Sequence, residues 1–166
     1  LSQADAWADW GGAAATSCSG THVLYTYGIG TIRNESASDW TAKGSRTALD
    51  SAIASKASDS CNASYKKLLP DITWSQQLIR SYFFVPTHSE WKSGARWVRC
   101  DVGVISTGTS VDKQKLSDLP SRISTLTNLV SDDPERFDYC VNSPDSVKQS
   151  GPLDSSMAKV ADCTQS

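Results

Sequence analysis

LIRSYFFVPTHSEWKSGARWVRCDVGVI, residues 78–105, is the stretch that decides the fold of this chain. Residues 78–85 are rich in aromatic and β-branched side chains, which favour a half-buried strand. Pro86 has no backbone N–H to give to a ladder and is expected to end that strand. A second run, 96–105, alternates in character at the period of a strand. The stretch therefore predicts two antiparallel strands joined by a turn-rich connector.

The connector and the second run carry further signals. Gly94 offers a positive φ where the chain must reverse, and His88 is expected to cap the turn at Ser89 and Glu90. The period of two divides the second run into a buried face and a partly hydrated face. The buried face holds Val98, Cys100, Val102 and Val104, and the hydrated face holds Trp97, Arg99 and Asp101, where Arg99 either pairs with Asp101 or stacks on an aromatic ring.

Two segments upstream complete the predicted core. Residues 45–69 form the strongest helix, because apolar side chains recur at one-turn spacing and many small residues allow close packing on a sheet. Pro70 ends it. Residues 23–32 form a first strand, in which two glycines, Gly28 and Gly30, indicate a bulge or a close backbone approach. One face of this strand is expected to hold Val23, Tyr25, Tyr27 and Ile29.

The fold class that follows is α+β. A small antiparallel sheet, near residues 23–32, 78–85 and 96–105, packs against the main helix at 45–69. Residues 106–110 signal a turn or linker. After it, amphipathic spacing within 113–130, broken by Pro120, predicts one or two short helices.

Five cysteines allow two disulfides with one thiol left over. A helix packed on the sheet brings Cys61 within range of the core-facing Cys100, and Cys140 and Cys163 flank one C-terminal loop. We predict these two bridges. Cys18 is then either unpaired or bonded to Cys61 in place of Cys100, because connectivity does not follow from sequence alone.

Composition restricts the compartment and the partners. The net charge of −2 favours neither nucleic acid nor an anionic membrane surface. No apolar run is long enough to cross a bilayer, and no signal peptide is visible, so Leu1 looks like a mature or trimmed start. Few Lys and Glu residues together with several cysteines favour an exported protein with paired thiols, over a cytosolic protein with buried thiols.

No strong catalytic or metal motif occurs. The chain has no glycine-rich phosphate loop, no nucleophile elbow and no His-Glu-x-x-His. Cys18 and His22 have half the spacing of a zinc site but lack a second pair of ligands, so we expect no metal and no cofactor. The two histidines, His22 and His88, each lie near a carboxylate or a thiol and leave a hydrolytic role open.

Three motifs together resemble the septum-formation family, whose members are small actinobacterial envelope domains. The longest is an aromatic run, a proline and then Trp-x-x-Gly-x-Arg-x-Val-x-Cys, carried here by Tyr82, Phe83, Pro86, Trp91, Gly94, Arg96, Val98 and Cys100. Residues 18–23 (CSGTHV) look like the family's Cys-x-x-Pro-His segment, with Thr21 in place of proline. Cys61 followed by Tyr65 and Leu68-Leu69 looks like its cysteine-bearing helix. The resemblance covers residues 18–105.

The resemblance implies an organisation in three parts. Residues 1–17 are an N-terminal segment, 18–108 are the septum-formation-like domain, and 109–166 are a C-terminal extension of short helices and loops. Residues 160–165 echo the segment around Cys18, so the extension is either a partial second repeat or a chance likeness.

The function implied is a non-catalytic extracytoplasmic binding or scaffold module of the cell envelope, secreted or lipid-anchored and linked to septum formation. Its partner is expected to be an envelope protein or a cell-wall component, and its oligomeric state is left open. The alternative is a small secreted hydrolase that uses His22 or His88. Because Arg and Trp dominate binding hot spots, the predicted recognition patch is Trp91, Arg96, Trp97 and Arg99, with a purely structural cation–π stack as the other interpretation.

Overall fold

The computed structural model describes residues 17, 19–33, 51–70, 72, 78–109, 114–142 and 159–163. These residues form an α+β fold, as the sequence predicts. The elements run in the order β1 (Tyr25–Thr31), α2 (Ser51–Leu68), β2 (Ile79–Phe84), α3 (His88–Lys92), β3 (Trp97–Val104), α4 (Ile123–Asp132), the 3₁₀ helix η5 (Pro134–Phe137), β4 (Tyr139–Asn142) and β5 (Lys159–Asp162).

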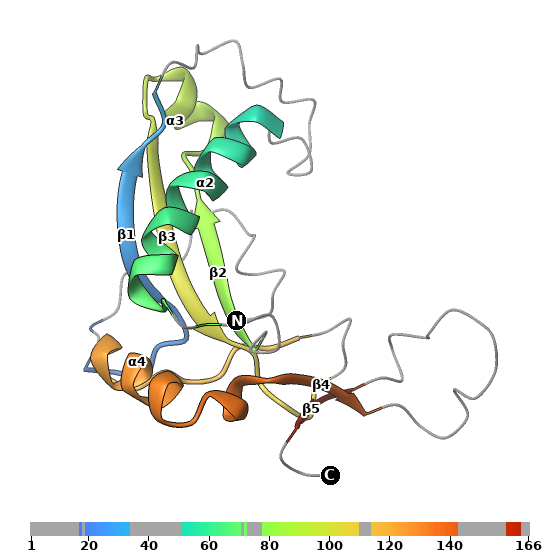
Figure 1. The fold of residues 1–166 in the computed structure, drawn as a ribbon. Coiled ribbons are helices and arrows are strands. Elements are labelled where there is room, and N and C mark those ends of the chain that lie inside the picture. The colour runs from blue at the N-terminus through green and yellow to red at the C-terminus, as the bar shows by residue number, and fades with distance from the viewer. Residues whose placement is uncertain are drawn as a thin grey trace, which may run out of the picture.

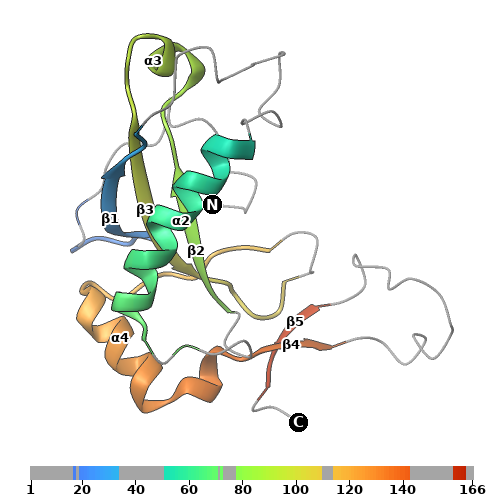
Figure 2. The same ribbon diagram turned by 45° about the horizontal axis from the view of Figure 1, so that its top comes forward.

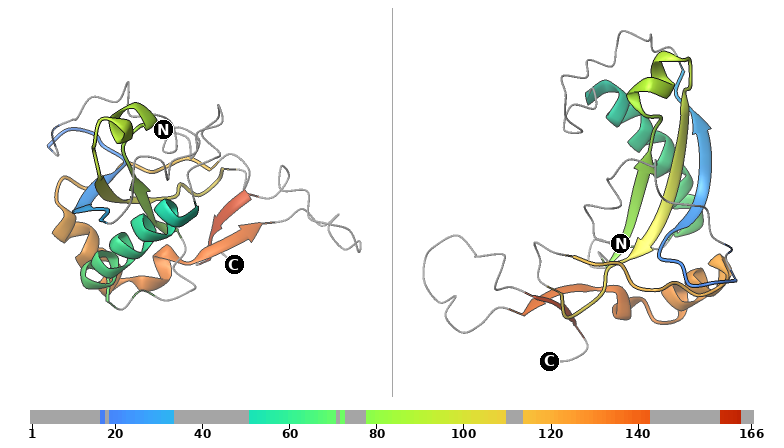
Figure 3. Two further views of the ribbon diagram at one scale, coloured as in Figure 1. Left: turned by 90° about the horizontal axis from the view of Figure 1, so that it is seen from above. Right: turned by 180° about the vertical axis from the view of Figure 1, so that it is seen from behind.

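The three predicted strands form one antiparallel sheet in the order β1-β3-β2. Helix α2 lies across one face of this sheet, as Figure 1 and Figure 2 show from two directions. Figure 3 shows α4 and η5 across one end of the sheet, with the β4–β5 pair extending away from the body. The sequence predicted the sheet and the main helix correctly, although the first part of the predicted helix, 45–50, lies outside the described residues.

Helix α2 packs close to the sheet because both surfaces are made of small residues. A Cβ atom added at Gly30 would lie 3.0 Å from Ser60 Oγ on the helix and 3.1 Å from Val98 Cγ1 on β3. A Cβ atom at Gly28 would lie 3.5 Å from Ser64 Cβ. The predicted close approach is therefore confirmed at Gly30, between α2 and β3, whereas the contacts at Gly28 are of ordinary length.

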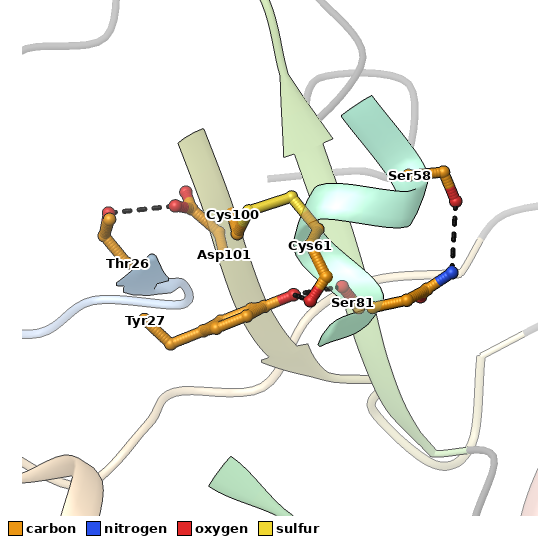
Figure 4. The surroundings of a disulfide bond; sticks show 8 residues. Thr26, Tyr27, Ser58, Cys61, Ser81, Cys100 and Asp101 are labelled. Atoms are coloured by element: carbon orange, nitrogen blue, oxygen red, sulfur yellow. Dashed lines mark hydrogen bonds between the residues drawn. A yellow bond between two sulfur atoms is a disulfide. The ribbon is translucent and has the colours of Figure 1, made fainter. Parts of the chain in front are cut away.

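A disulfide joins the helix to the middle of the sheet. Cys61 and Cys100 are bonded with a Cα–Cα distance of 5.3 Å, and both are buried. Figure 4 shows Cys100 reaching from β3 to the helix while its neighbour Asp101 reaches to the other side of the strand. The Tyr27 hydroxyl donates to the Cys61 carbonyl oxygen at 3.3 Å and lies 2.5 Å from Ser81 Oγ. Side chains from both edge strands, β1 and β2, therefore form hydrogen bonds next to the disulfide.

A β-bulge in β1 changes one prediction. The pairing with β3 shifts register between Thr26 and Gly28. Tyr25 is buried in the core and Tyr27 packs against it, but the extra residue turns Ile29 to the opposite face. The prediction that Ile29 shares a face with both tyrosines is therefore wrong. The glycines at this position indicated a bulge, but they did not indicate which side chains the bulge would turn to the other face of the sheet.

The short helix α3 in the turn between β2 and β3 is capped by Thr87. Thr87 is the N-cap of α3, and its side chain accepts from the Glu90 N–H at 3.3 Å while Glu90 Oε2 accepts from the Thr87 N–H at 2.8 Å. This capping box satisfies two backbone donors reciprocally. The predicted capping by His88 stays a prediction, because the His88 side chain lies outside the described residues. Gly94 follows with φ +97°, the positive value that the sequence predicted.

The C-terminal part contains the predicted short helix and an unpredicted strand pair. Pro120 precedes α4, whose Leu126 and Val130 join the core beneath the sheet. Strands β4 and β5 are antiparallel and bridged by Cys140–Cys163, the second predicted disulfide, with a Cα–Cα distance of 5.2 Å. Val160 of β5 is buried against Leu78 and Ile105, and this contact fastens the pair to the end of the sheet. The boundaries proposed at 17/18 and 108/109 stay predictions, as does the partial repeat.

The helix–sheet contact makes a sharp prediction about Gly30. The Gly30→Ala variant forces its new Cβ against Ser60 Oγ and Val98 and should lose about 1–3 kcal/mol of unfolding free energy in urea denaturation. Gly28→Ala is the matched control, since its Cβ meets only ordinary contacts, and it should lose less. Adding Ser60→Ala to Gly30→Ala should restore part of the loss. Equal losses for the two glycine variants would contradict the close-contact account.

Candidate functional site

The strongest candidate is the face of the sheet that α2 does not cover, here called the outer face. The register places Thr26, Ile29 and Thr31 of β1 opposite Asp101, Arg99 and Trp97 of β3. Tyr82 and Phe84 of β2 lie opposite Asp101 and Arg99. Directly opposite residues in an antiparallel pair share a face, so these eight side chains lie on one surface.

The outer face has a covered half and an open half. Around Asp101 and Gly103 it is covered by Leu24 and Leu116, which pack with Tyr82 and Phe84 into a small apolar cluster. Toward α3 the cover ends: Thr31 is exposed and Ile29 is 79% exposed. Ile29 is the exposed large hydrophobic residue of the described part of the chain. The open half therefore combines Ile29 and Thr31 with the partly exposed Arg99 and Trp97.

A buried ion pair underlies this surface. Arg99 Nη2 donates to Asp101 Oδ2 at 2.5 Å, and Thr26 Oγ1 donates to Asp101 Oδ1 at 2.9 Å. Figure 4 shows the Thr26–Asp101 bond on the side of β3 away from the disulfide. The Arg99 guanidinium carbon also lies 4.9 Å from the ring centroid of Phe84. Both predicted roles of Arg99, the ion pair and the aromatic stack, are present together.

Burial, more than charge, sets the electrostatics of this pair. The Asp101 side chain is only 1% exposed, so the prediction that it faces a hydrated side is wrong. Loss of solvation raises the pKa of Asp101, and the Arg99 charge and the hydrogen bonds from Thr26 and Arg99 oppose that rise. Burial likewise lowers the pKa of Arg99, against the attraction of Asp101. The Arg99 side chain, 25% exposed, is the part of the pair that reaches the surface.

The other two predicted patch residues lie elsewhere. The Arg96 guanidinium carbon is 3.9 Å from the ring centroid of Trp91, and its Nη1 donates to the carbonyl oxygens of Trp91 at 2.8 Å and Ala95 at 2.7 Å. Trp91 is fully buried in the cluster around the Cys61–Cys100 bridge. Strand alternation puts Arg96 on the helix side of β3, opposite in direction to Trp97 and Arg99.

The structure thus does not bring all four predicted residues into one patch. A side chain without exposed surface does not touch a partner, so Trp91 is a platform for Arg96 and not a contact residue. Trp97 and Arg99 remain together on the outer face. The residue that the sequence analysis missed is Ile29, whose only signal was the glycine on each side of it.

His22 has a local structural environment. Its Nδ1 lies 2.8 Å from the Gly20 carbonyl oxygen, which identifies Nδ1 as the donor, and its ring packs edge-on against Tyr25 with centroids 4.5 Å apart. The side chain is 7% exposed, and its Nε2 is buried without a hydrogen-bond partner in the described structure. Cys18 and the His88 side chain lie outside the described residues.

The described residues contain neither a metal-binding cluster nor a membrane-spanning helix. Among them, no three His, Cys, Asp or Glu side chains gather as a metal ion would require. Within the same ranges, no helix combines the length and the apolar character needed to cross a membrane.

Comparison with known proteins gives one match. A family model described as septum formation matches residues 3–165, nearly the whole chain. This span extends well beyond residues 18–105, which carry the recognisable motifs. The search of curated proteins and the search of solved structures each returned no match.

The ion pair predicts a pH-dependent loss of stability. Arg99→Met leaves a buried Asp101 carboxylate without its cation and should lose about 3–5 kcal/mol of unfolding free energy at pH 7. A carboxyl whose folded pKa lies above its unfolded value favours the folded state fully below the unfolded value, and that contribution disappears as pH rises through the folded pKa. The difference from wild type should therefore shrink toward about pH 4, the unfolded pKa of Asp.

The matched control is Arg99→Met/Asp101→Asn, which removes the ionisable group. Its difference from wild type should be smaller at pH 7 and nearly independent of pH, as measured by urea denaturation at several pH values. A single variant Arg99→Met whose deficit stays constant between neutral and acidic pH would contradict the assignment of a buried, paired carboxylate.

Proposed function

The chain belongs to the septum-formation family, and from that premise we propose that it is a non-catalytic binding module of the cell envelope, acting at the septum. Its contact surface is the open half of the outer face. The partner is an envelope protein or a cell-wall component. The protein is secreted or held at the surface of an actinobacterial cell by a lipid anchor.

Two observations support a role outside the cytoplasm. The family match indicates a septum-related envelope protein. The two disulfides, Cys61–Cys100 and Cys140–Cys163, fit an oxidising compartment, because cytoplasmic thiols are kept reduced.

The observation that carries the binding role is the position of Ile29. A 79% exposed isoleucine lies directly opposite the partly exposed Arg99, with Trp97 opposite Thr31 on the next row of the same surface. Solvation favours neither an exposed isoleucine nor the exposed part of a tryptophan, whereas an interface gains from covering both. Arg99 adds a cation held in place from below by Asp101. Apolar, aromatic and arginine side chains of this kind are enriched at binding hot spots.

The hydrolase alternative has less support from His22. The ring is buried against Tyr25, and its Nδ1 is used by a backbone carbonyl two residues away. A general base is instead expected to face a cleft with its proton acceptor open to the substrate. The His88 side chain lies outside the described residues.

The surface can be tested by affinity capture from an envelope extract of the native host. Wild type should recover a partner that Ile29→Asp does not, because a carboxylate at 29 removes the apolar contact and neutralises Arg99 locally. Arg99→Lys should recover less of the partner than wild type does, because lysine keeps the positive charge but lacks the planar set of N–H donors of the guanidinium. Arg99→Ala is unsuitable, because it would leave Asp101 unpaired.

Asp59→Ser is the matched control, because Asp59 is an exposed residue of α2, on the other side of the sheet. It should recover the partner as wild type does. Capture that is the same for wild type and Ile29→Asp, or that is lost in Asp59→Ser, would overturn the assignment of the binding surface.

A further inference from the structure

The outer edge of β1 differs from the other edge of the same sheet. Strand β2 carries Arg80 and is followed closely by Pro86, two features that discourage another strand from pairing with an edge. Strand β1 and the residue after it, 25–32, contain neither a charged residue nor a proline. Figure 1 and Figure 3 show β1 as the outermost strand, and within the described ranges no strand pairs with its outer side.

The register identifies which backbone groups point outward. The Ile32 N–H donates to the Arg96 carbonyl oxygen at 2.7 Å, so Ile32 directs its backbone groups toward β3. In an antiparallel ladder such residues alternate with residues whose N–H and C=O point away from the partner. Ile29 and Thr31, which lie opposite Arg99 and Trp97, are therefore the residues that present a donor and an acceptor each to the open edge.

The side chains beside this edge are apolar and cationic. Ile29 projects from the outer face, and Arg33, exposed, continues the same alternation one row past Thr31. Arg99 lies directly opposite Ile29 on β3. The carboxylate on the outer face of β3, Asp101, is buried and already bonded to Arg99 and Thr26. A chain lying along β1 would thus meet an apolar side chain in the middle and positive charge toward the α3 end.

We propose that the open edge of β1 binds an extended segment of a partner polypeptide, which adds to the sheet as a fourth strand. The backbone groups of Ile29 and Thr31 supply the main-chain hydrogen bonds, which give affinity in this mode of recognition. Specificity comes from an apolar side chain beside Ile29 and an acidic one beside Arg33. This inference rests on the proposed binding function and names the class of its partner.

The charges favour a segment of a different protein, and not a second copy of this chain, as the occupant of the β1 edge. Residues 25–32 carry no Asp or Glu, so a neighbouring copy of β1 would offer Arg33 no carboxylate. A partner segment that alternates apolar with acidic residues matches both Ile29 and Arg33 without rearranging the edge.

The test uses a proline that blocks the edge but leaves the sheet intact. Thr31→Pro removes the outward N–H, while the Gly30 and Ile32 groups that face β3 are untouched. A phage-displayed library of random short peptides is selected on the wild-type chain, and the affinities of the recovered peptides are measured by fluorescence anisotropy. The peptides should alternate apolar and acidic residues. Their affinity for Thr31→Pro should fall about tenfold or more, the value of one lost hydrogen bond to a partner.

Three controls make the result decisive. Thr31→Ala keeps the N–H and removes only the side chain, so it should lose much less affinity than Thr31→Pro. Arg33→Glu should reverse the preference of the selected peptides from acidic to basic. Ile29→Lys, which leaves every backbone group in place, should weaken binding independently of any effect of proline on folding.

Several results would overturn strand addition. One is the absence of any enriched peptide, and another is equal affinity of the peptides for wild type and Thr31→Pro. A third is self-association of wild type in sedimentation that Thr31→Pro abolishes, because the occupant of the edge would then be a second copy of this chain. If Ile29→Asp loses the envelope partner while Thr31→Pro retains it, strand addition fails and the binding surface stands. If neither variant loses the partner, both proposals fail.

Discussion

The close contact between α2 and the sheet, locked by the Cys61–Cys100 bridge, is the constraint on which the rest of the structure depends. Glycines on β1 face serines on α2, and a Cβ atom added at Gly30 would lie only 3.0 Å from Ser60 Oγ. The bridge closes a separation of 39 residues between the helix and the central strand. A crosslink of that length contributes about 4 kcal/mol by restricting the unfolded chain, a large part of the stability of a domain of this size.

This contact on one side of β3 determines what the other side can do. The helix face takes the apolar side chains, the disulfide and Trp91, so the remaining side chains of β3 must lie on the outer face. There, Asp101 is buried and holds Arg99, while Trp97 and Ile29 stay partly or largely open. A rigid support on one side and a half-covered surface on the other is the arrangement expected of a small binding module, because pre-organised contact groups lose little freedom on binding.

Much of the fold could be predicted from local pattern. Alternation in 78–105, together with Pro86 and Gly94, located two strands and their turn, and helical spacing located α2. Helix and strand periodicity also placed Cys61 and Cys100 on facing surfaces. The site was harder, because it depends on contacts that the local pattern does not encode. The bulge turned Ile29 to the outer face. Leu24 and Leu116 packed against Tyr82 and Phe84 on that face. Arg96 stacked on Trp91, away from Arg99. The β4–β5 pair was missed because its two short strands are separated by a long sequence interval.

The most direct test of the central constraint compares the two disulfides by urea denaturation. By loop length alone, removing Cys61–Cys100 and removing Cys140–Cys163 should lose similar amounts, about 4 and about 3.5 kcal/mol. The account predicts that Cys61→Ala/Cys100→Ala loses clearly more, because its sulfurs are buried between helix and sheet, whereas Cys140 and Cys163 are half-buried at the periphery. An equal loss for the two double variants, or a larger loss for Cys140→Ala/Cys163→Ala, would contradict it.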